Sequence, residues 1–363
     1  MHDTVIFLGA GATKSVGGPL TDEILPAIVN DASSPDPTGR VPRLRQFLLD
    51  QFHVTPGSPS EAFPGLPMLM SLIDTALERR ESLHPSWDYN NLQDIRECVE
   101  LGIFDVLEEK LFKAQTTNHF SLFHTLYPVA APPAVQSEPC VISTNYDLIA
   151  DTAMMFMSES RLPEGGLPAY LCSISTDFYR DPHKPHFGKL LKLHGSLNWL
   201  YCRTCHRLEI GASDARKYLK ILNSLVGPSL EQAYQIDGGI CPTPNCLGKL
   251  RPLLIAPTHL KNYRNPHIAQ VWYEAEQMLR TAGRVIFIGY SLPEDDVEII
   301  YLLKRSLAHL TPSQITVVSY NPAMPPLGSD PIGRRYRTLF GDAIDWHPEG
   351  IDPWLPTAAA SVP

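Results

Sequence analysis

Three features are missing from this chain of 363 residues. No apolar run reaches about 18 residues, the length that a helix needs to cross a bilayer. The segment from Met1 to Leu8 has no basic stretch of the kind that opens a secretory signal peptide. An excess of positive charge is also missing, because 30 Lys and Arg residues stand against 39 Asp and Glu, for a net charge of −9. We therefore expect a cytoplasmic protein that binds neither membranes nor nucleic acids directly.

Cysteines are few, and the chain has no signal that would direct it to a compartment where a disulfide framework forms. The chain has seven, and a disulfide framework needs an oxidising compartment for which there is no targeting signal. Four of them form two close pairs, Cys202 with Cys205 and Cys241 with Cys246. Two such pairs can converge on one tetrahedral thiolate site. The sequence therefore predicts a structural zinc module over 201–250, with incidental buried thiols as the alternative.

Five short apolar runs end in small or polar residues. They are 5–8, 140–143, 190–193, 285–288 and 315–319. Continuous apolar runs separated by helical stretches are typical of a parallel sheet. Ligands of such sheets bind beyond the carboxyl ends of the strands, where this chain carries its polar residues. We predict an α/β fold with a Rossmann-like parallel sheet and helices on both faces.

Amphipathic patterns between these runs predict helices. The patterns cover 68–81, 92–115, 267–282 and 294–308, whereas 31–67 is rich in Pro, Ser and Gly and is expected to be loop. The domain boundaries that follow are a Rossmann-like core (1–30, 128–200 and 251–347), a mostly helical insertion (31–127), the cysteine module (201–250) and a C-terminal tail (348–363).

A glycine-rich turn follows the first predicted strand. Gly9 and Gly11 would let the backbone approach a pyrophosphate, which the N-terminus of the next helix attracts. A full dinucleotide fingerprint, G-x-G-x-x-G, needs a third glycine at position 14, where Lys14 stands. Glycine turns after strands are also common for purely structural reasons. The pattern is compatible with phosphate binding and argues against an ordinary dehydrogenase.

Polar side chains follow two other predicted strands. His194 comes directly after 190–193, and Asn145 and Asp147 occupy the equivalent end of 140–143. Histidine exchanges a proton near neutral pH, and an amide can orient water or a substrate carbonyl. We therefore take His194, Asn145 and Asp147 as a candidate catalytic group. A hydrogen-bonded structural histidine is the alternative reading of His194.

Six motifs occur in one order along the chain. They are Gly9-Ala-Gly-Ala-Thr13, Ser143-Thr-Asn-Tyr-Asp147, Lys192-Leu-His-Gly195, the two cysteine pairs, Gly289-Tyr-Ser-Leu292 and Tyr320-Asn321. As a set they resemble the sirtuin, or silent-information-regulator-two, family of NAD-consuming enzymes. The resemblance covers the strands and the cysteine module but not the insertion 31–127.

The resemblance implies NAD as substrate and a structural Zn²⁺ as cofactor. The expected NAD contacts are Gly9, Ala10, Gly11, Ala12 and Thr13 at the phosphates, Thr144, Asn145 and Asp147 at the nicotinamide ribose, Gly289 and Ser291 at the phosphates and ribose, Asn321 at the adenosine ribose and Asp342 at the adenine. His194 would be the general base at the ribose hydroxyls. The four paired cysteines would hold the zinc.

The chain departs from the sirtuin deacylases in three places. Their Pro-Asp-Phe-Arg element is replaced by residues 16–23, which contain no Phe-Arg pair. Their peptide-pairing Val-x-Phe-Gly-Glu run is replaced by residues 253–260, where Pro257 removes a backbone donor. Thr144 stands where the family has glutamine. These differences resemble the divergent branch that includes bacterial NAD hydrolases of antiphage defence.

The leading expectation is therefore an NAD hydrolase. It would cleave the bond between nicotinamide and ribose and release nicotinamide and ADP-ribose, with a cyclised product left open. An NAD-dependent lysine deacylase is the first alternative, and a non-catalytic NAD or ADP-ribose sensor is the second. A homo-oligomer or a defence-system partner protein is the expected assembly.

Overall fold

The computed structural model describes residues 2–30, 39–111, 117–128, 138–162, 164–183, 185–210, 240–259, 261, 263–294 and 296–361. The chain divides into two compact units. The larger unit comprises Met1–Gly17, Phe112–Leu254 and Tyr263–Pro363, and the smaller comprises Gly18–Leu111 and Ile255–Asn262. The predicted insertion and cysteine module lie partly outside the described residues, so their limits stay predictions.

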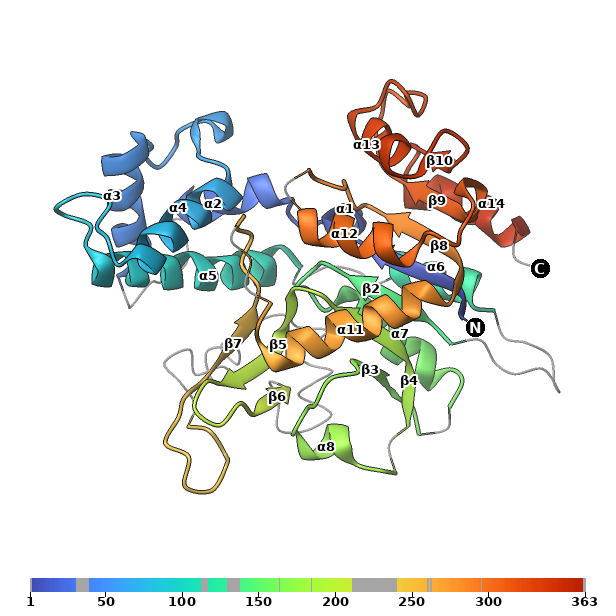
Figure 1. Cartoon of the computed structure of the whole chain (residues 1–363), viewed down its shortest axis with the longest axis horizontal. Helices are drawn as coiled ribbons and strands as arrows, with labels where there is room; N and C mark the ends of the chain where they lie inside the picture. Colours follow the sequence, from blue (N-terminus) through green and yellow to red (C-terminus); the bar gives the residue numbers. More distant parts are fainter. Residues whose placement is uncertain are drawn as a thin grey trace. The chain divides into compact units, whose positions relative to one another are not determined.

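A seven-stranded parallel sheet forms the core of the larger unit (Figure 1). Its strands, in spatial order, are β10 (Asp345–His347), β9 (Ile315–Val318), β8 (Ala282–Ile288), β1 (His2–Leu8), β2 (Cys140–Ser143), β4 (His186–Lys192) and β3 (Leu167–Ala169). All of their pairings are parallel. The predicted α/β sheet is confirmed, with all five predicted strands. The strands β3 and β10 were not predicted, because three residues are too few to make an apolar run.

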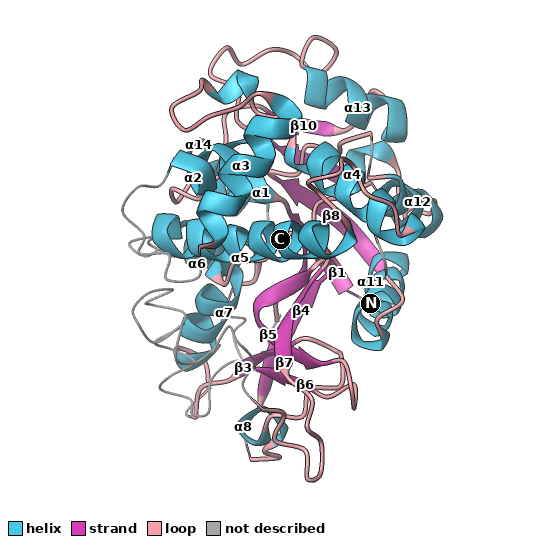
Figure 2. Cartoon of the chain, turned by 90° about the vertical axis from the view of Figure 1, so that its left-hand side faces the viewer, coloured by secondary structure: helices cyan, strands magenta, loops and turns pink. Residues whose placement is uncertain are grey.

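Helices cover both faces of this sheet (Figure 2). The helices α11 (Pro266–Arg280) and α12 (Val297–Ser306) lie on one face, and α6 (Thr117–Leu126) and α7 (Ile149–Glu159) lie on the other. The predicted helices at 267–282 and 294–308 are thus confirmed. At the start of α11, the Asn265 side chain accepts hydrogen bonds from the amides of His267 and Ile268 at 3.0 and 3.4 Å, which fixes the beginning of the helix.

Among its described residues, the larger unit also contains the 3-10 helix η2 (Pro312–Gln314) and four shorter or peripheral α-helices. The four α-helices are α1 (Ala10–Lys14), α8 (Asp177–Arg180), α13 (Pro331–Phe340) and α14 (Ile351–Ser361). The helix α1 follows the glycine turn, as expected, and α14 occupies most of the predicted tail. Of the helices that the structure describes, none combines the length and the apolar character needed to span a membrane.

The smaller unit is helical. Its helices are α2 (Thr21–Asn30), α3 (Arg40–Phe52), η1 (Ser60–Ala62), α4 (Leu66–Arg79) and α5 (Tyr89–Leu111). The helix predicted at 68–81 is confirmed by α4, and the one predicted at 92–115 is confirmed by α5 as far as Leu111, since 112–115 lie outside the described residues. The expectation of loop throughout 31–67 is wrong, because α3 lies within it. Pro42 lies in the first turn of α3, where proline is tolerated, and buried Leu44, Phe47 and Leu48 follow a helical spacing.

A second, antiparallel sheet follows β4 in the chain. It has the order β6-β5-β7, with β5 at Gly195–Cys202, β6 at Leu208–Ile210 and β7 at Leu250–Leu254. Cys202 ends β5, and Cys205 lies in the turn that leads to β6. This small sheet is therefore the support on which the cysteine cluster is built.

Candidate functional site

Two glycine turns meet at the carboxyl ends of the neighbouring strands β1 and β8. The amide of Gly9 donates to the carbonyl of Ile288 at 3.0 Å, and the amide of Gly11 donates to the carbonyl of Gly289 at 2.8 Å. A Cβ on Gly9 would lie 2.5 Å from Tyr290 Cα, and a Cβ on Gly289 would overlap the backbone of Gly11 and Ala12. Glycine is therefore required here by the close approach of two backbones.

The same contacts change the expected phosphate cradle. The amides of Gly9 and Gly11 donate to Ile288 and Gly289, and the amide of Ala12 donates to the carbonyl of Gly9 at 2.9 Å. Three of the five residues expected at the NAD phosphates therefore use their backbone amides in hydrogen bonds within the protein. The phosphate role of Gly9, Gly11 and Ala12 stays a prediction, as does that of Ala10.

Side chains tie the turn after β2 to the glycine turn. Asn145 Nδ2 donates to the carbonyl of Gly9 at 2.9 Å and to Thr13 Oγ1 at 3.0 Å. The Thr13 hydroxyl in turn donates to Asp147 Oδ2 at 2.7 Å, and the amide of Thr144 donates to the carbonyl of Leu8 at 3.0 Å. The structure therefore joins Gly9, Thr13, Asn145 and Asp147 in one hydrogen-bonded group. Both Asn145 bonds use Nδ2, so they leave its Oδ1 to face other groups.

His194 lies at the same edge of the sheet. The register of β2 and β4 pairs Ser143 with Lys192, and the amide of Leu193 donates to the carbonyl of Ser143 at 2.9 Å. His194 and Asn145 each lie two residues beyond this pair. His194 is 8% exposed, and its ring centre lies 6.4 Å from those of both Tyr146 and Tyr263. The three predicted catalytic residues thus follow two adjacent strands, and their roles stay predictions.

The residues expected at the adenosine side make their contacts elsewhere. Asn321 Nδ2 donates to Asp330 Oδ2 at 2.8 Å, and Asn321 Oδ1 accepts from the amide of Ala323 at 3.1 Å. Ser291 is exposed and its carbonyl accepts from Arg335 Nε at 2.9 Å. These bonds hold the loops after β8 and β9 in place, and they do not join them to the group around Asn145.

Asp342 is separated from the other expected NAD contacts. It precedes β10, whereas the others follow the carboxyl ends of β1, β2, β8 and β9. Its carboxylate is 76% exposed and forms an ion pair with Arg337 of α13. The amino and carboxyl ends of a parallel strand lie at opposite edges of the sheet. The structure therefore does not bring Asp342 to the edge that carries the other residues.

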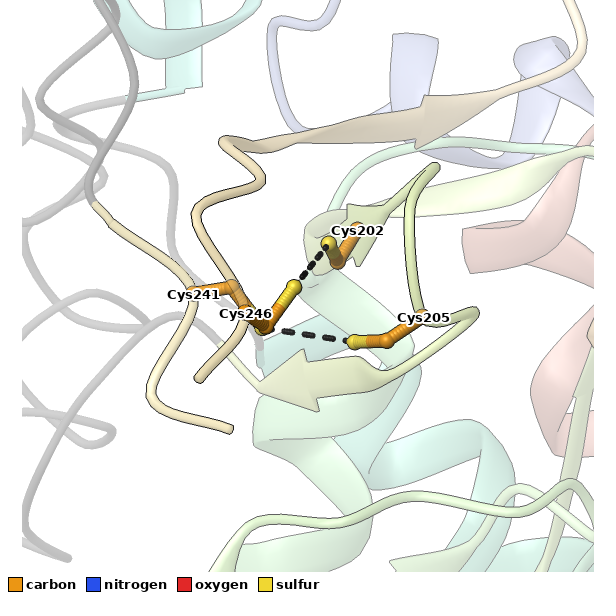
Figure 3. A group of neighbouring side chains, drawn as sticks. All are labelled: Cys202, Cys205, Cys241 and Cys246. Atoms are coloured by element: carbon orange, nitrogen blue, oxygen red, sulfur yellow. Dashed lines mark hydrogen bonds between the residues drawn. The ribbon is translucent and has the colours of Figure 1, made fainter. Parts of the chain in front are cut away.

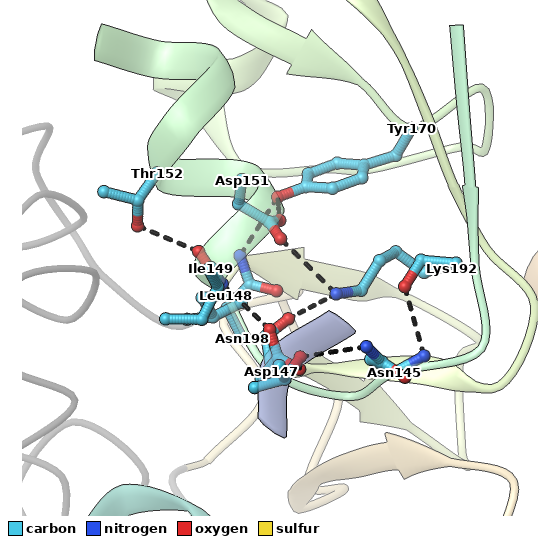
Figure 4. A network of polar contacts seen from close by, with 11 residues as sticks. Asn145, Asp147, Leu148, Ile149, Asp151, Thr152, Tyr170, Lys192 and Asn198 are labelled. Carbon is cyan, nitrogen blue, oxygen red and sulfur yellow. Dashed lines mark hydrogen bonds and ion pairs between the residues drawn. The ribbon is translucent and has the colours of Figure 1, made fainter. Parts of the chain in front are cut away.

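A buried charged network lies beside Asp147 (Figure 4), and no sequence motif predicted it. Lys192 Nζ donates to the backbone carbonyl of Asp147 and lies 3.3 Å from Asp151 Oδ2. The other Asp151 oxygen accepts from the Tyr170 hydroxyl, which accepts from Asn198 Nδ2 at 3.2 Å. Burial raises the pKa of Asp151, and the ammonium of Lys192 opposes that rise. The sequence could have indicated this network only by a charged residue inside an otherwise apolar strand or helix.

A second missed residue is His119 of α6. It is 1% exposed, and within the described part of the chain its Nδ1 has no hydrogen-bond partner. Burial lowers the pKa of His119 to about 4, with the charge of Asp147 opposing this shift and that of Lys192 adding to it. The imidazole is therefore neutral at pH 7. No motif pointed to it, because it lies in the predicted insertion.

The four paired cysteines form one cluster (Figure 3). All of the Sγ atoms lie within 4.8 Å of one another, with Cys202 and Cys246 at 3.7 Å and Cys205 and Cys241 at 3.5 Å. Zinc bound tetrahedrally at about 2.3 Å from each sulfur requires sulfur separations of about 3.8 Å. No disulfide joins any of the seven cysteines, all of which the structure describes. The predicted convergence of the two pairs is confirmed, and the cluster could hold a metal ion.

No protein-family model and no curated protein matches this chain. The similar solved structures include Sir2 proteins. A Sir2 homologue in complex with NAD is 14% identical, with a TM-score of 0.45 over 99% of this chain and 91% of that chain. A Sir2 complex with a p53 peptide and NAD⁺ is 14% identical, with a TM-score of 0.42 over 99% and 92%. A Sir2 protein bound to a propionylated peptide is 13% identical, with a TM-score of 0.41 over 99% and 92%. At these identities and TM-scores, the likeness does not assign a function to this chain.

Proposed function

We propose that this protein hydrolyses NAD at the bond between nicotinamide and ribose. The observation that carries the proposal is the hydrogen-bonded chain from Asn145 through Thr13 to Asp147, with His194 at the end of the adjacent strand. It unites residues from three of the motifs that resemble those of sirtuins. The positions beyond the carboxyl ends of β1, β2 and β4 are those where parallel sheets bind nucleotides.

The chemistry needs a stabilised cationic ribose and a water nucleophile. As the C–N bond breaks, its electron pair stays on the nicotinamide nitrogen, and positive charge develops on the ribosyl group. The Asp147 carboxylate supplies nearby negative charge. It is held by Thr13 and by the amide of Ile149 at 3.0 Å, so its part is electrostatic and does not require proton transfer.

His194 and Asn145 would act on the attacking water. Asn145 would orient the water or the nicotinamide amide. As the water oxygen bonds to the ribose carbon, its proton would pass to His194. The products are nicotinamide and ADP-ribose, and no acylated peptide takes part.

The cysteine cluster would hold structural zinc. Four thiolates occupy all four coordination positions of a tetrahedral zinc ion and leave none for substrate. The metal would therefore stabilise this module and take no part in the reaction. We expect about one zinc per chain by metal analysis and a lower melting temperature after chelation. Unchanged melting in chelator and no bound zinc would contradict this assignment.

The catalytic assignment is tested with variants of the purified protein. We expect Asn145→Ala and His194→Ala each to lower kcat for NAD by roughly 10²- to 10⁴-fold. The control is His183→Ala, because His183 is exposed in a loop. Full activity in both test variants would contradict the assignment. Tight NAD binding without turnover in the wild type would indicate a sensor instead.

The proposed biological role is depletion of NAD during phage infection. It depends on the resemblance to bacterial antiphage enzymes, and so does the expected homo-oligomer or partner protein. Expression of the wild type and of the His194→Ala variant in phage-challenged bacteria tests it. Equal phage yields and equal cellular NAD in the two strains would contradict the role.

A further inference from the structure

Lys192 and Asp151 form an ion pair that is sealed from solvent. The Lys192 side chain is 1% exposed and that of Asp151 is fully buried. Removing two charges from water is costly, and apolar side chains of similar volume often give equal or better stability. Stability alone therefore does not account for a lysine at this position in the apolar strand β4.

The ammonium of Lys192 is directed at the backbone of the proposed site. It donates to the carbonyl of Asp147, which ends the Thr144–Asp147 turn. The carboxylate of the same residue is held from the other side by the Thr13 hydroxyl and the Ile149 amide. Asp147 is thus fixed through both its main chain and its side chain.

Asp151 fixes the ammonium in this position. One of its oxygens lies 3.3 Å from Lys192 Nζ, and the other accepts from the Tyr170 hydroxyl. Asn198 of β5 donates to that hydroxyl at 3.2 Å. Three elements of the fold therefore hold the charge of Lys192 against the turn (Figure 4).

Lys192 also has a particular place in the chain. It ends β4 and lies two residues before His194, while its side chain reaches the turn that carries Asn145. One residue thus connects the strand leading to the proposed base with the turn carrying the proposed amide. A shift of about 1 Å between catalytic groups can lower a rate by about 100-fold.

We propose that Lys192 is a positioning residue that fixes the Asn145–Asp147 turn relative to His194, and that Asp151 holds its ammonium in place. This inference rests on the proposed function for the roles of Asn145 and His194. The bonds that Lys192 makes are independent of that function, so they can be tested separately.

The test compares Lys192→Met, Asp151→Asn and the double variant. Lys192→Met leaves the Asp151 carboxylate buried without its cation, so we expect the lowest melting temperature. The double variant removes both charges, so we expect it to regain most of that loss. Its kcat for NAD should stay at least 10-fold below wild type with little change in KM, because the Asp147 carbonyl has lost its donor.

Lys189→Met, on the same strand, is the control and should keep wild-type kcat. Recovery of both melting temperature and kcat in the double variant would overturn the proposal.

Hydrogen exchange separates this inference from the proposed function. The amides of Thr144 and Leu197 donate to the carbonyls of Leu8 and Tyr146 at 3.0 and 2.9 Å, and they report directly on the turn. We expect exchange across 144–149 at least 10-fold faster in the double variant, with the β8 amides unchanged. Unchanged exchange across 144–149 would overturn the positioning role, whether or not the wild type consumes NAD.

Asp151→Asn alone gives a milder perturbation, in case the double variant does not fold. It keeps the ammonium and weakens its anchor, so the same amides should exchange faster by a smaller factor. Wild-type exchange in this variant would overturn the role assigned to Asp151.

Discussion

The two ends of the proposed NAD site are held together in different ways. Beyond β1, β2 and β4, the bonds run between side chains that are themselves candidates for the reaction, as from Asn145 to Thr13 and on to Asp147. Beyond β8 and β9, Asn321 and Ser291 are held by bonds to residues with no expected NAD role, which are Asp330 and Arg335. In the first region, the fold itself therefore fixes the candidate side chains relative to one another. We expect changes there to alter kcat and changes in the second region to alter KM.

The largest effect should come from the point where the two regions meet. Gly289→Ala places a Cβ against the backbone of Gly11 and Ala12, at a residue whose φ is +61°. We expect a loss of about 3 kcal/mol or more in the free energy of unfolding, because neither backbone can move aside. Thermal or urea unfolding measures it.

The matched control is Gly39→Ala. Gly39 has a similar φ of +67°, and nothing lies within 4 Å of the position of its Cβ. We expect it to cost only about 1 to 2 kcal/mol. Equal destabilisation by the two substitutions would show that conformational strain, and not the contact of the two turns, explains the requirement for Gly289.

The next effect is at Thr13, which links Asn145 and Asp147, two of the three catalytic candidates of the first region. Thr13→Val keeps the shape of the side chain but removes the acceptor for Asn145 and the donor to Asp147. We expect kcat for NAD to fall by about 10- to 100-fold with little change in KM. Thr13→Ser should retain most of the activity because it keeps the hydroxyl. An equal loss in both variants would contradict a role for the hydroxyl.

Two histidines that lie near the two regions, His119 of α6 and His347 of β10, should give stability responses to pH in opposite directions. The pKa of His119 is lowered to about 4 by burial, so an unfolded chain binds more protons between pH 4 and 6.5. The stability owed to this histidine is present above pH 6.5 and is lost as the pH falls toward 4. His347 on β10 has its pKa raised by hydrogen bonds to Asp345 and Glu349. Its contribution is present below pH 6.5 and is lost as the pH rises through its folded-state pKa.

Urea unfolding over pH 4 to 8 separates these two contributions. His119→Leu should flatten the stability profile below pH 6.5, and His347→Gln should flatten it above that pH. His183→Leu, at an exposed position, is the control and should leave the profile unchanged. A wild-type slope below pH 6.5 in His119→Leu would contradict the assignment to His119.

The smallest effects are expected in the second region. Asn321→Ala should raise KM for NAD by a few-fold and leave kcat unchanged, because the loop loses its bond to Asp330. Asp342→Ala should leave both constants unchanged, since Asp342 precedes β10 and is exposed. Steady-state kinetics test both. A large fall in kcat for Asn321→Ala would remove the distinction between the two regions.

The core of the fold could be predicted because its strands are buried on both faces. The runs at 5–8 and 285–288 are apolar at every position, so their own residues indicate strands that are buried on both faces. The strands β3 and β10 could not be found in this way, because their three residues are held mainly by a neighbouring strand. The helix α3 was not predicted because it contains Pro42, although its buried residues keep a helical spacing.

The site was predictable where a polar residue directly follows a buried strand, as Asn145 and His194 do. The partners of those residues were not, because they depend on contacts between distant segments. The pairing of Lys192 with Asp151 needs the packing of α7 against β4, and no local spacing encodes it. Asp342 shows the reverse error, since a short motif suggested a role that its place before β10 does not support.

The most direct test of the central claim is a product time course with purified protein and NAD alone. The account predicts nicotinamide and ADP-ribose in equal amounts, at a rate that an added acyl-lysine peptide does not change. Nicotinamide release that occurs only with the peptide, or no release under either condition, would contradict it.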